Sequence, residues 1–85
     1  MDEKTLQFLK SMREQGKKHG SREVYSADAA RNLGMTPGSV RDREYKARLA
    51  DLVENRYLEP HPDRSLTAQG VYLITAKGMA RADEE

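Results

Sequence analysis

Basic and hydroxyl side chains follow one another closely in the middle of the chain. Ser39, Arg41, Arg43 and Lys46 lie within one short stretch, just after Gly38. Arginine can form two parallel hydrogen bonds with the edge of a guanine, whereas serine and lysine more often contact phosphate oxygens. A glycine beside them allows the backbone to approach a phosphate closely. These residue types in this order are suited to the recognition of a nucleic acid.

The stretch A-R-N-L-G-M-T-P-G-S-V at residues 30–40 predicts the element that would present these side chains. Gly34 follows the last apolar residue of a short helix, where a left-handed residue without a Cβ atom is favoured. Thr36 can cap the next helix with its hydroxyl, and Pro37 suits the first helical position. Two short helices joined this tightly cross at a steep angle, and the second helix of such a pair can enter the major groove of DNA.

The spacing of apolar and turn-forming residues predicts the remaining elements. We expect helices over residues 2–15, 27–33, 37–55 and 76–82, a minor strand at 23–25 and main strands at 57–60 and 71–74. Ser26 and Thr75 are the expected N-caps of the helices that follow them. Lys17 and Lys18, between two glycines, are expected in a mobile basic loop, and residues 61–70 in a mobile polar loop.

The expected hydrophobic core is small and lies between the second and third helices and the last strand. The residues expected in it are Leu33, Met35, Val40, Leu49, Leu52 and Ile74. Phe8 and Met12 on the first helix and Met79 on the last helix are the exposed apolar candidates for self-association. Because no long apolar element is left over, we expect at most a weak homodimer, or a dimer that forms on DNA.

Composition excludes several functional classes. At 85 residues the chain has room for one core, so residues 1–85 are expected to form one domain. There is no cysteine, and two histidines alone cannot form a zinc site, so we expect no metal and no cofactor. No converging carboxylates, activated nucleophile or phosphate-binding glycine loop is evident, so we expect no enzyme. Without a long apolar run or a signal-like N-terminus, the expected location is cytoplasmic.

The net charge of +1 conceals an uneven distribution along the chain. Residues 10–48 carry ten Lys or Arg and five Asp or Glu, whereas both flanking segments are acidic overall. The basic excess therefore coincides with the expected helix-turn-helix, which is the pattern of a nucleic-acid binder. A merely solvated charged face is the alternative interpretation.

Two local motifs resemble the winged helix-turn-helix superfamily. They are A-x-x-L-G-M-T-x-x-x-V at residues 30–40 and Y-L-I-T-A-K-G-M-A at residues 72–80, and the resemblance covers about residues 5–82. It implies an α+β fold, mostly α, with a three-helix core, a two-stranded β-hairpin wing and a short C-terminal helix. The chain departs from the superfamily in one respect. The segment between Val40 and the strand at residues 57–60 is longer than is usual in the superfamily, by roughly one helical turn. The third helix is therefore expected to be extended or kinked.

The resemblance implies a sequence-specific protein that binds double-stranded DNA, as a small transcriptional regulator or a phage or plasmid accessory factor. Residues 37–55 would enter the major groove, and residues 61–70 would lie at the minor groove or the backbone. The candidate DNA contacts are Lys17, Lys18, Ser26, Thr36, Gly38, Ser39, Arg41, Arg43, Lys46, Arg64 and Ser65. The alternatives are a winged-helix module for protein–protein contact, favoured by the acidic residues in the third helix, and RNA binding.

Overall fold

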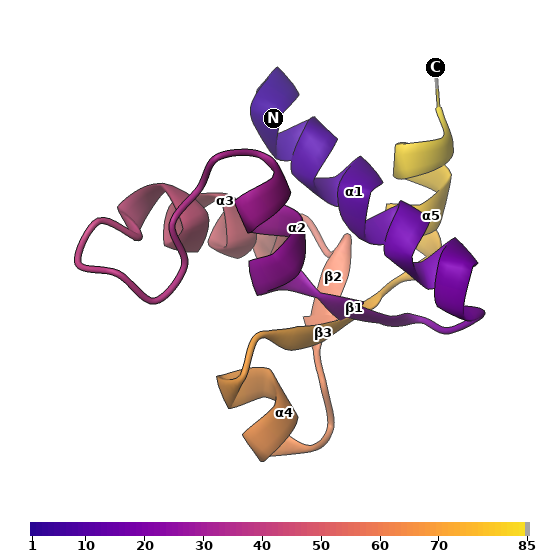
Figure 1. Cartoon of the computed structure of the whole chain (residues 1–85). Helices are drawn as coiled ribbons and strands as arrows, with labels where there is room; N and C mark the ends of the chain where they lie inside the picture. The colour runs from indigo at the N-terminus through magenta and orange to yellow at the C-terminus, as the bar shows by residue number, and fades with distance from the viewer. Residues whose placement is uncertain (85) are drawn as a thin grey trace.

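The computed structural model describes residues 1–84 and shows an α+β fold that is mostly helical (Figure 1). Its helices are α1 (Glu3–His19), α2 (Ser26–Asn32), α3 (Arg43–Glu54), α4 (Arg64–Ala68) and α5 (Ala76–Asp83). Its strands are β1 (Glu23–Tyr25), β2 (Leu58–Pro60) and β3 (Val71–Ile74), which confirms the three expected strands to within a residue.

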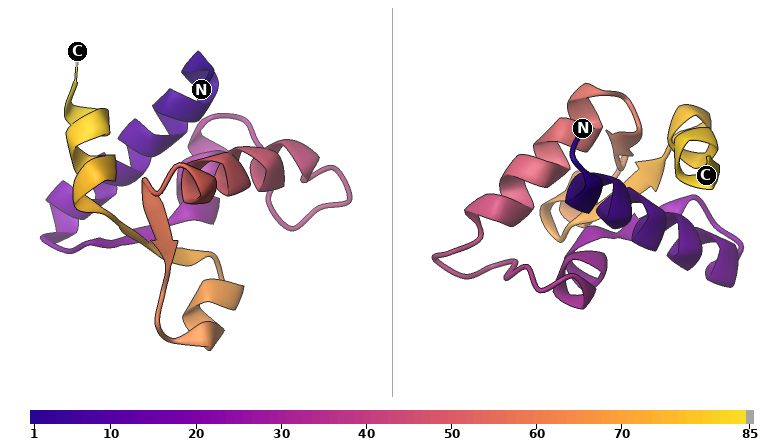
Figure 2. Two further views of the ribbon diagram at one scale, coloured as in Figure 1. Left: turned by 180° about the vertical axis from the view of Figure 1, so that it is seen from behind. Right: turned by 90° about the horizontal axis from the view of Figure 1, so that it is seen from above.

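The three strands form one antiparallel sheet with β3 in the centre. Glu23 of β1 pairs with Leu73 of β3, and Leu58 of β2 pairs with Ile74. The expected two-stranded hairpin therefore has a third strand on its other side. The helices α1, α2 and α5 lie on one side of this sheet, and α4 extends from the other side (Figures 1 and 2).

The core is built around α1, which contacts α2, α3, α5 and β1. Phe8, Leu9 and Met12 of α1 are fully buried and pack with Leu52 and Ile74 from α3 and β3. Burial of Leu49, Leu52 and Ile74 confirms that part of the expected core. The expectation that Phe8 and Met12 are exposed was wrong, because α1 is the central helix of the core.

The helix α1 continues through Gly16 to His19, so the expected loop at Lys17 and Lys18 was wrong. Gly16 does not end the helix but allows the returning chain to pass close to it. The Ser21 N–H donates to the Gly16 carbonyl at 3.0 Å, and a Cβ atom on Gly16 would lie only 2.8 Å from the Ser21 carbonyl oxygen. Lys17 and Lys18 consequently lie in the last helical turn, where the helix dipole favours cations.

The connection between α2 and α3 is longer than a tight helix-turn-helix allows. Gly34 has φ +79°, as expected, and its N–H donates to the Arg31 carbonyl at 3.1 Å while the Met35 N–H donates to the Ala30 carbonyl at 3.0 Å. These two bonds end α2 in a Schellman motif. The next helix begins only at Arg43, so the helix expected from residue 37 was wrong in its first six residues.

The segment between these helices, residues 33–42, is called the α2–α3 loop below. Thr36 is not an N-cap, and Pro37 does not start a helix. Val40 is 98% exposed, so its expected burial was wrong. Leu33 is half-buried against the core, and Met35 is buried as expected.

Residues 61–70, expected to form a polar loop, include the short helix α4. Asp63 caps α4 by accepting the Ser65 N–H at 3.0 Å, and the Thr67 hydroxyl donates to the His61 carbonyl at 2.9 Å. At the following helix, Thr75 accepts the Gly78 N–H at 2.9 Å, which confirms it as the N-cap of α5.

Candidate nucleic-acid interface

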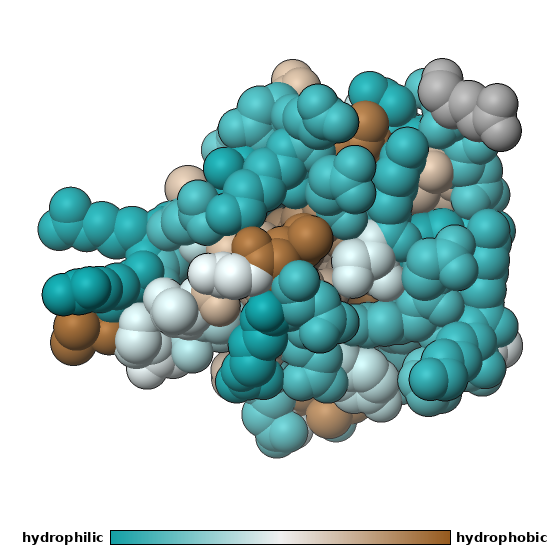
Figure 3. All heavy atoms as spheres, turned by 45° about the horizontal axis from the view of Figure 1, so that its top comes forward, coloured by the Kyte–Doolittle hydropathy of each residue, from teal (hydrophilic) through white to brown (hydrophobic). Residues whose placement is uncertain are grey.

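The α2–α3 loop projects away from the sheet and from the end of α1, as all three ribbon views show (Figures 1 and 2). Hydrophilic side chains cover most of the face seen in the space-filling view, and hydrophobic ones appear there in small separate groups (Figure 3). A projecting loop can reach into a groove of a duplex.

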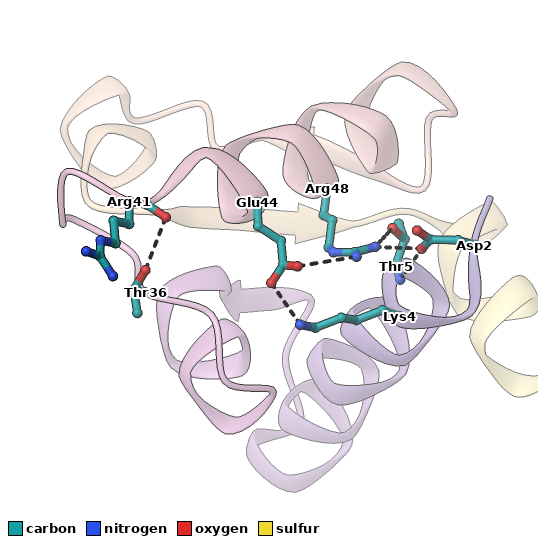
Figure 4. A network of polar contacts seen from close by, with 7 residues as sticks. All are labelled: Asp2, Lys4, Thr5, Thr36, Arg41, Glu44 and Arg48. Atoms are coloured by element: carbon teal, nitrogen blue, oxygen red, sulfur yellow. Dashed lines mark hydrogen bonds and ion pairs between the residues drawn. The ribbon is translucent and has the colours of Figure 1, made fainter.

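Hydroxyl groups within the α2–α3 loop determine its shape. Thr36 Oγ1 donates to the Arg41 carbonyl at 3.2 Å (Figure 4), and Ser39 Oγ donates to the Thr36 carbonyl at 3.0 Å. The Arg41 N–H in turn donates to Ser39 Oγ at 3.0 Å. Local side-chain bonds of this kind compete with helix formation, and they explain why no helix begins at Pro37. The hydroxyl hydrogens of Thr36 and Ser39 are thus donated within the loop.

Arg41 near the end of this loop and Arg43 at the start of α3 both have exposed side chains. Within residues 1–84, neither forms an ion pair with an acidic side chain, and the same holds for Arg64 on α4. Some other surface arginines are paired: Arg13 lies 3.2 Å from Asp83, and Arg22 lies 3.1 Å from Glu59. Arg56, after the end of α3, is exposed and likewise forms no ion pair within residues 1–84. A phosphate or a base edge would therefore not have to displace a carboxylate from Arg41, Arg43 or Arg64.

The side of α3 that faces α1 has a different use. Arg48 Nη1 lies 2.6 Å from Asp2 Oδ1 and donates to Thr5 Oγ1 at 2.8 Å, while Glu44 accepts from Lys4 Nζ at 2.8 Å (Figure 4). Arg48 lowers the pKa of Asp2 strongly, and Lys4 lowers the pKa of Glu44. Arg48 is thus committed to the contact between α1 and α3.

This arrangement also neutralises the main acidic group near the start of α3. Glu44 is paired with Lys4 and lies 3.5 Å from Arg48, so its charge is compensated within the protein. Lys46 lies 3.5 Å from Asp42, the N-cap residue of the same helix. Its side chain is 72% exposed, so that ion pair can exchange readily with an external anion.

A groove of about 420 Å³ separates the α2–α3 loop and the start of α3 from α4 and the turn that follows it. The residues that line it are Ala27, Arg31, Pro37, Gly38, Tyr45, Lys46, Leu49, Thr67, Ala68, Gln69, Gly70 and Tyr72. Of the expected contacts, Gly38 and Lys46 meet here, with Arg41 and Arg43 in the same loop and helix start. Arg31 and Gln69, which also line the groove, are not among the expected contacts. Their positions at the ends of two short helices become neighbouring only through the fold.

Two buried residues, Ser26 and Gly70, and the partly buried Tyr45 fix the walls of this groove relative to each other. Ser26 Oγ donates to the Gly70 carbonyl at 2.7 Å, and the Tyr45 hydroxyl lies 2.7 Å from Ser26 Oγ. Ser26 is fully buried and lies inside α2, whose N-cap is Tyr25. Its expected roles as N-cap and as phosphate contact were therefore wrong, because its hydroxyl joins α2 to the turn before β3.

The last turn of α1 lies at the opposite end of the molecule from the α2–α3 loop (Figures 1 and 2). Lys17 in this turn lies 3.5 Å from Asp83 and 3.6 Å from Glu14. Lys17 and Lys18 are thus not brought together with the other expected contacts. On α4, Arg64 is exposed, while Ser65 Oγ donates to Asp63 at 2.8 Å.

Among residues 1–84, no helix is long and apolar enough to cross a membrane, and no three His, Cys, Asp or Glu side chains are placed to hold a metal ion. The sequence matches no protein-family model, no curated protein and no solved structure.

Proposed function

We propose that this chain binds double-stranded DNA through the α2–α3 loop, the first turn of α3 and α4. The observation that carries the proposal is the state of Arg41 and Arg43, which are exposed and without an acidic partner in residues 1–84. Arg41 extends from a projecting loop whose shape is held by its own hydroxyl groups, and Arg43 extends from the first turn of α3, which follows this loop. Two arginines presented in this way suit base edges and phosphates, which accept hydrogen bonds from guanidinium groups.

The order of the elements supports a winged helix-turn-helix arrangement as the basis of this binding. Along the chain, α1, β1, α2, α3, β2 and β3 follow one another in the order that the resemblance implies. In this proposal α1, α2 and α3 form the three-helix unit, and β2, α4 and β3 form the wing. Such a domain would serve as a small transcriptional regulator or as a phage or plasmid accessory factor.

The proposed mode of entry differs from that of a helix starting at Pro37. The loop and the first turn of α3 would enter the major groove, which at roughly 12 Å wide admits a helix or a two-stranded ribbon. Arg64 on α4 would contact the neighbouring backbone or the minor groove, where a narrow groove concentrates negative potential. The groove between the loop and α4 would then face the phosphates that separate the two contacts.

Binding to a random-sequence DNA duplex pool, followed by fluorescence anisotropy with the recovered duplexes, tests this proposal. Arg41→Ala and Arg43→Ala should each weaken binding by roughly 1–3 kcal/mol if the contact is a bidentate one. Lys18→Ala is the matched control, because it also removes one exposed positive charge, from the opposite end of the molecule. Unchanged affinity in both arginine variants, or an equal loss in the lysine variant, would contradict the proposed interface.

A second candidate function is a module for protein–protein contact. It is favoured by a mostly apolar hollow of about 320 Å³ between α3 and the sheet, lined by Lys46, Leu49, Ala50, Val53, Pro60 and Tyr72. Salt dependence separates the two functions. Phosphate contacts release counterions, so DNA affinity falls steeply with salt. Contact with an apolar partner surface would depend on salt far less.

A further inference from the structure

Val40 is the most exposed large hydrophobic residue in the described part of the chain. It is 98% exposed, whereas the next two, Met1 and Tyr25, are 49% and 43% exposed. It lies in the α2–α3 loop, next to Arg41. A single exposed apolar side chain is ordinary on a protein surface, so its significance depends on how it is presented.

The loop presents Val40 in a fixed setting. The hydroxyl of Thr36 spans the turn to the Arg41 carbonyl, and Ser39 bonds to both limbs of it. Gly38 has φ +78°, a conformation that lets the chain turn just before Ser39 and Val40. Val40 itself is β-branched, so few side-chain rotamers are open to it. An incoming ligand would have little conformational entropy to remove from this residue.

The surroundings of Val40 indicate what that ligand offers. The hydroxyl hydrogen of the preceding Ser39 is already donated to the Thr36 carbonyl, so the tip pairs an apolar group with the cation of Arg41. A ligand that suits both carries a negative charge close to a small apolar group. In the major groove of DNA, the apolar group at the base edges is the 5-methyl group of thymine, and phosphates lie beside it.

We propose that Val40 contacts the 5-methyl group of a pyrimidine in the major groove and so contributes to the choice of DNA sequence. This inference rests on the proposed DNA binding and adds one specificity-determining residue to it. Thymine and 5-methylcytosine carry the methyl group, whereas uracil and cytosine lack it. Loss of one buried methyl contact corresponds to about a fourfold loss of affinity.

The test uses duplexes recovered from the random-sequence pool and copies of them in which single thymines are replaced by uracil. For the wild-type protein, uracil at the contacted position should weaken binding about fourfold. Val40→Ala should weaken binding to the thymine duplex by a similar factor and should no longer distinguish uracil from thymine. Val40→Thr keeps the branched shape and one of the two methyl groups, so it should still distinguish uracil from thymine, but less strongly than the wild type does.

The outcomes separate this inference from the proposed function. If the wild type binds duplexes tightly but no uracil substitution weakens binding, Val40 does not contact a methyl group and DNA binding stands. If Val40→Ala still distinguishes uracil from thymine, another residue contacts the methyl group, and the inference is wrong. If no duplex is bound at any salt concentration, the proposed function fails and the inference fails with it.

Discussion

The Tyr45 hydroxyl lies 2.7 Å from Ser26 Oγ, and Ser26 Oγ in turn donates to the Gly70 carbonyl at 2.7 Å. Because Ser26 has one hydroxyl hydrogen and a carbonyl can only accept, Tyr45 must be the donor to Ser26. The start of α2, the first turn of α3 and the turn before β3 are thus joined at one point. A Cβ atom on Gly70 would lie 3.1 Å from Ser26 Oγ, so the close approach suits a glycine.

This chain of hydrogen bonds predicts that Ser26→Ala destabilises the fold more than Tyr45→Phe does. Ser26→Ala leaves the Tyr45 hydroxyl and the Gly70 carbonyl with one partner fewer in a buried place, at a cost of roughly 1–3 kcal/mol. Tyr45→Phe removes only a donor, at about 1 kcal/mol. Urea denaturation measures both, with the exposed Tyr25→Phe as the control. Equal stability of Ser26→Ala and the parent would show that the chain of bonds contributes nothing.

Leu52 and Val40 were both expected in the core, but only Leu52 is buried, and this difference gives a second prediction. Leu52 is fully buried between α3 and the core, so Leu52→Ala should lower the free energy of unfolding by roughly 2–5 kcal/mol. Val40→Ala, at an exposed position, should change it by no more than about 0.5 kcal/mol. Thermal or urea melts check both. A Val40 variant as unstable as the Leu52 variant would contradict the exposed loop.

The difference between these two residues shows which parts of the fold could be predicted from the sequence. The stripe containing Leu49 and Leu52 repeats at helical spacing, and Val71–Ile74 is a β-branched and aromatic run, so local patterns sufficed for both. The start of α3 could not be predicted in this way. Thr36 followed by a proline has the composition of a helix N-terminus, but the hydroxyl bonds across the loop favour a different backbone.

The sequence indicated some residues of the candidate interface, which stays a prediction. Arg41 and Arg43 stand out in the sequence as basic residues on a segment with few core positions. Two facts depend on contacts between distant residues and leave no local signal. Arg48 is held by Asp2, the N-cap residue of α1, and the buried Ser26 is bonded to Gly70. Sequence periodicity carries no information about such pairs.

The pairing of Asp2 with Arg48 predicts a loss of stability in acid. Hydrogen bonds from Arg48 and from the Thr5 N–H lower the pKa of Asp2 in the folded protein. The folded state therefore binds fewer protons than the unfolded state, and this contribution is complete above the ordinary range of an Asp carboxyl, near pH 4. It is lost as the pH falls from there towards the lowered pKa. Glu44, Asp63 and Asp83, whose pKa values are also lowered, act in the same direction.

Asp2→Asn tests the share of Asp2 in this effect. Asparagine can still cap α1 through its side-chain oxygen, so the variant removes the charge and keeps the cap. Its melting temperature should fall less than that of the parent between neutral pH and pH values below the Asp range. Glu54→Gln is the control, because Glu54 is exposed and forms no ion pair within residues 1–84. Parallel pH curves for Asp2→Asn and the parent would contradict the pairing.

The packing of α5 predicts an unusual effect of alanine. In most exposed helical positions, Gly→Ala stabilises a helix by about 1 kcal/mol. Gly78 is buried in the first turn of α5, and a Cβ atom there would overlap the Tyr57 carbonyl and contact Ile74. Gly78→Ala should therefore destabilise the protein, and by more than Ala80→Gly at an exposed position of the same helix. Denaturant titration of the two variants decides this, and a more stable Gly78→Ala protein would show that α5 does not pack so closely.

The contribution of α4 to DNA binding gives the last prediction. Arg64 is exposed, begins α4 and has no acidic partner in residues 1–84, so Arg64→Ala should leave the melting temperature nearly unchanged. If Arg64 contacts a phosphate, its removal should weaken binding for all duplex sequences and lower the slope of log affinity against log salt by about one unit. Lys18→Ala should leave that slope unchanged, because the end of α1 faces away from the α2–α3 loop. Equal slopes for Arg64→Ala and the parent would remove α4 from the interface, leaving the loop and the first turn of α3 to bind alone.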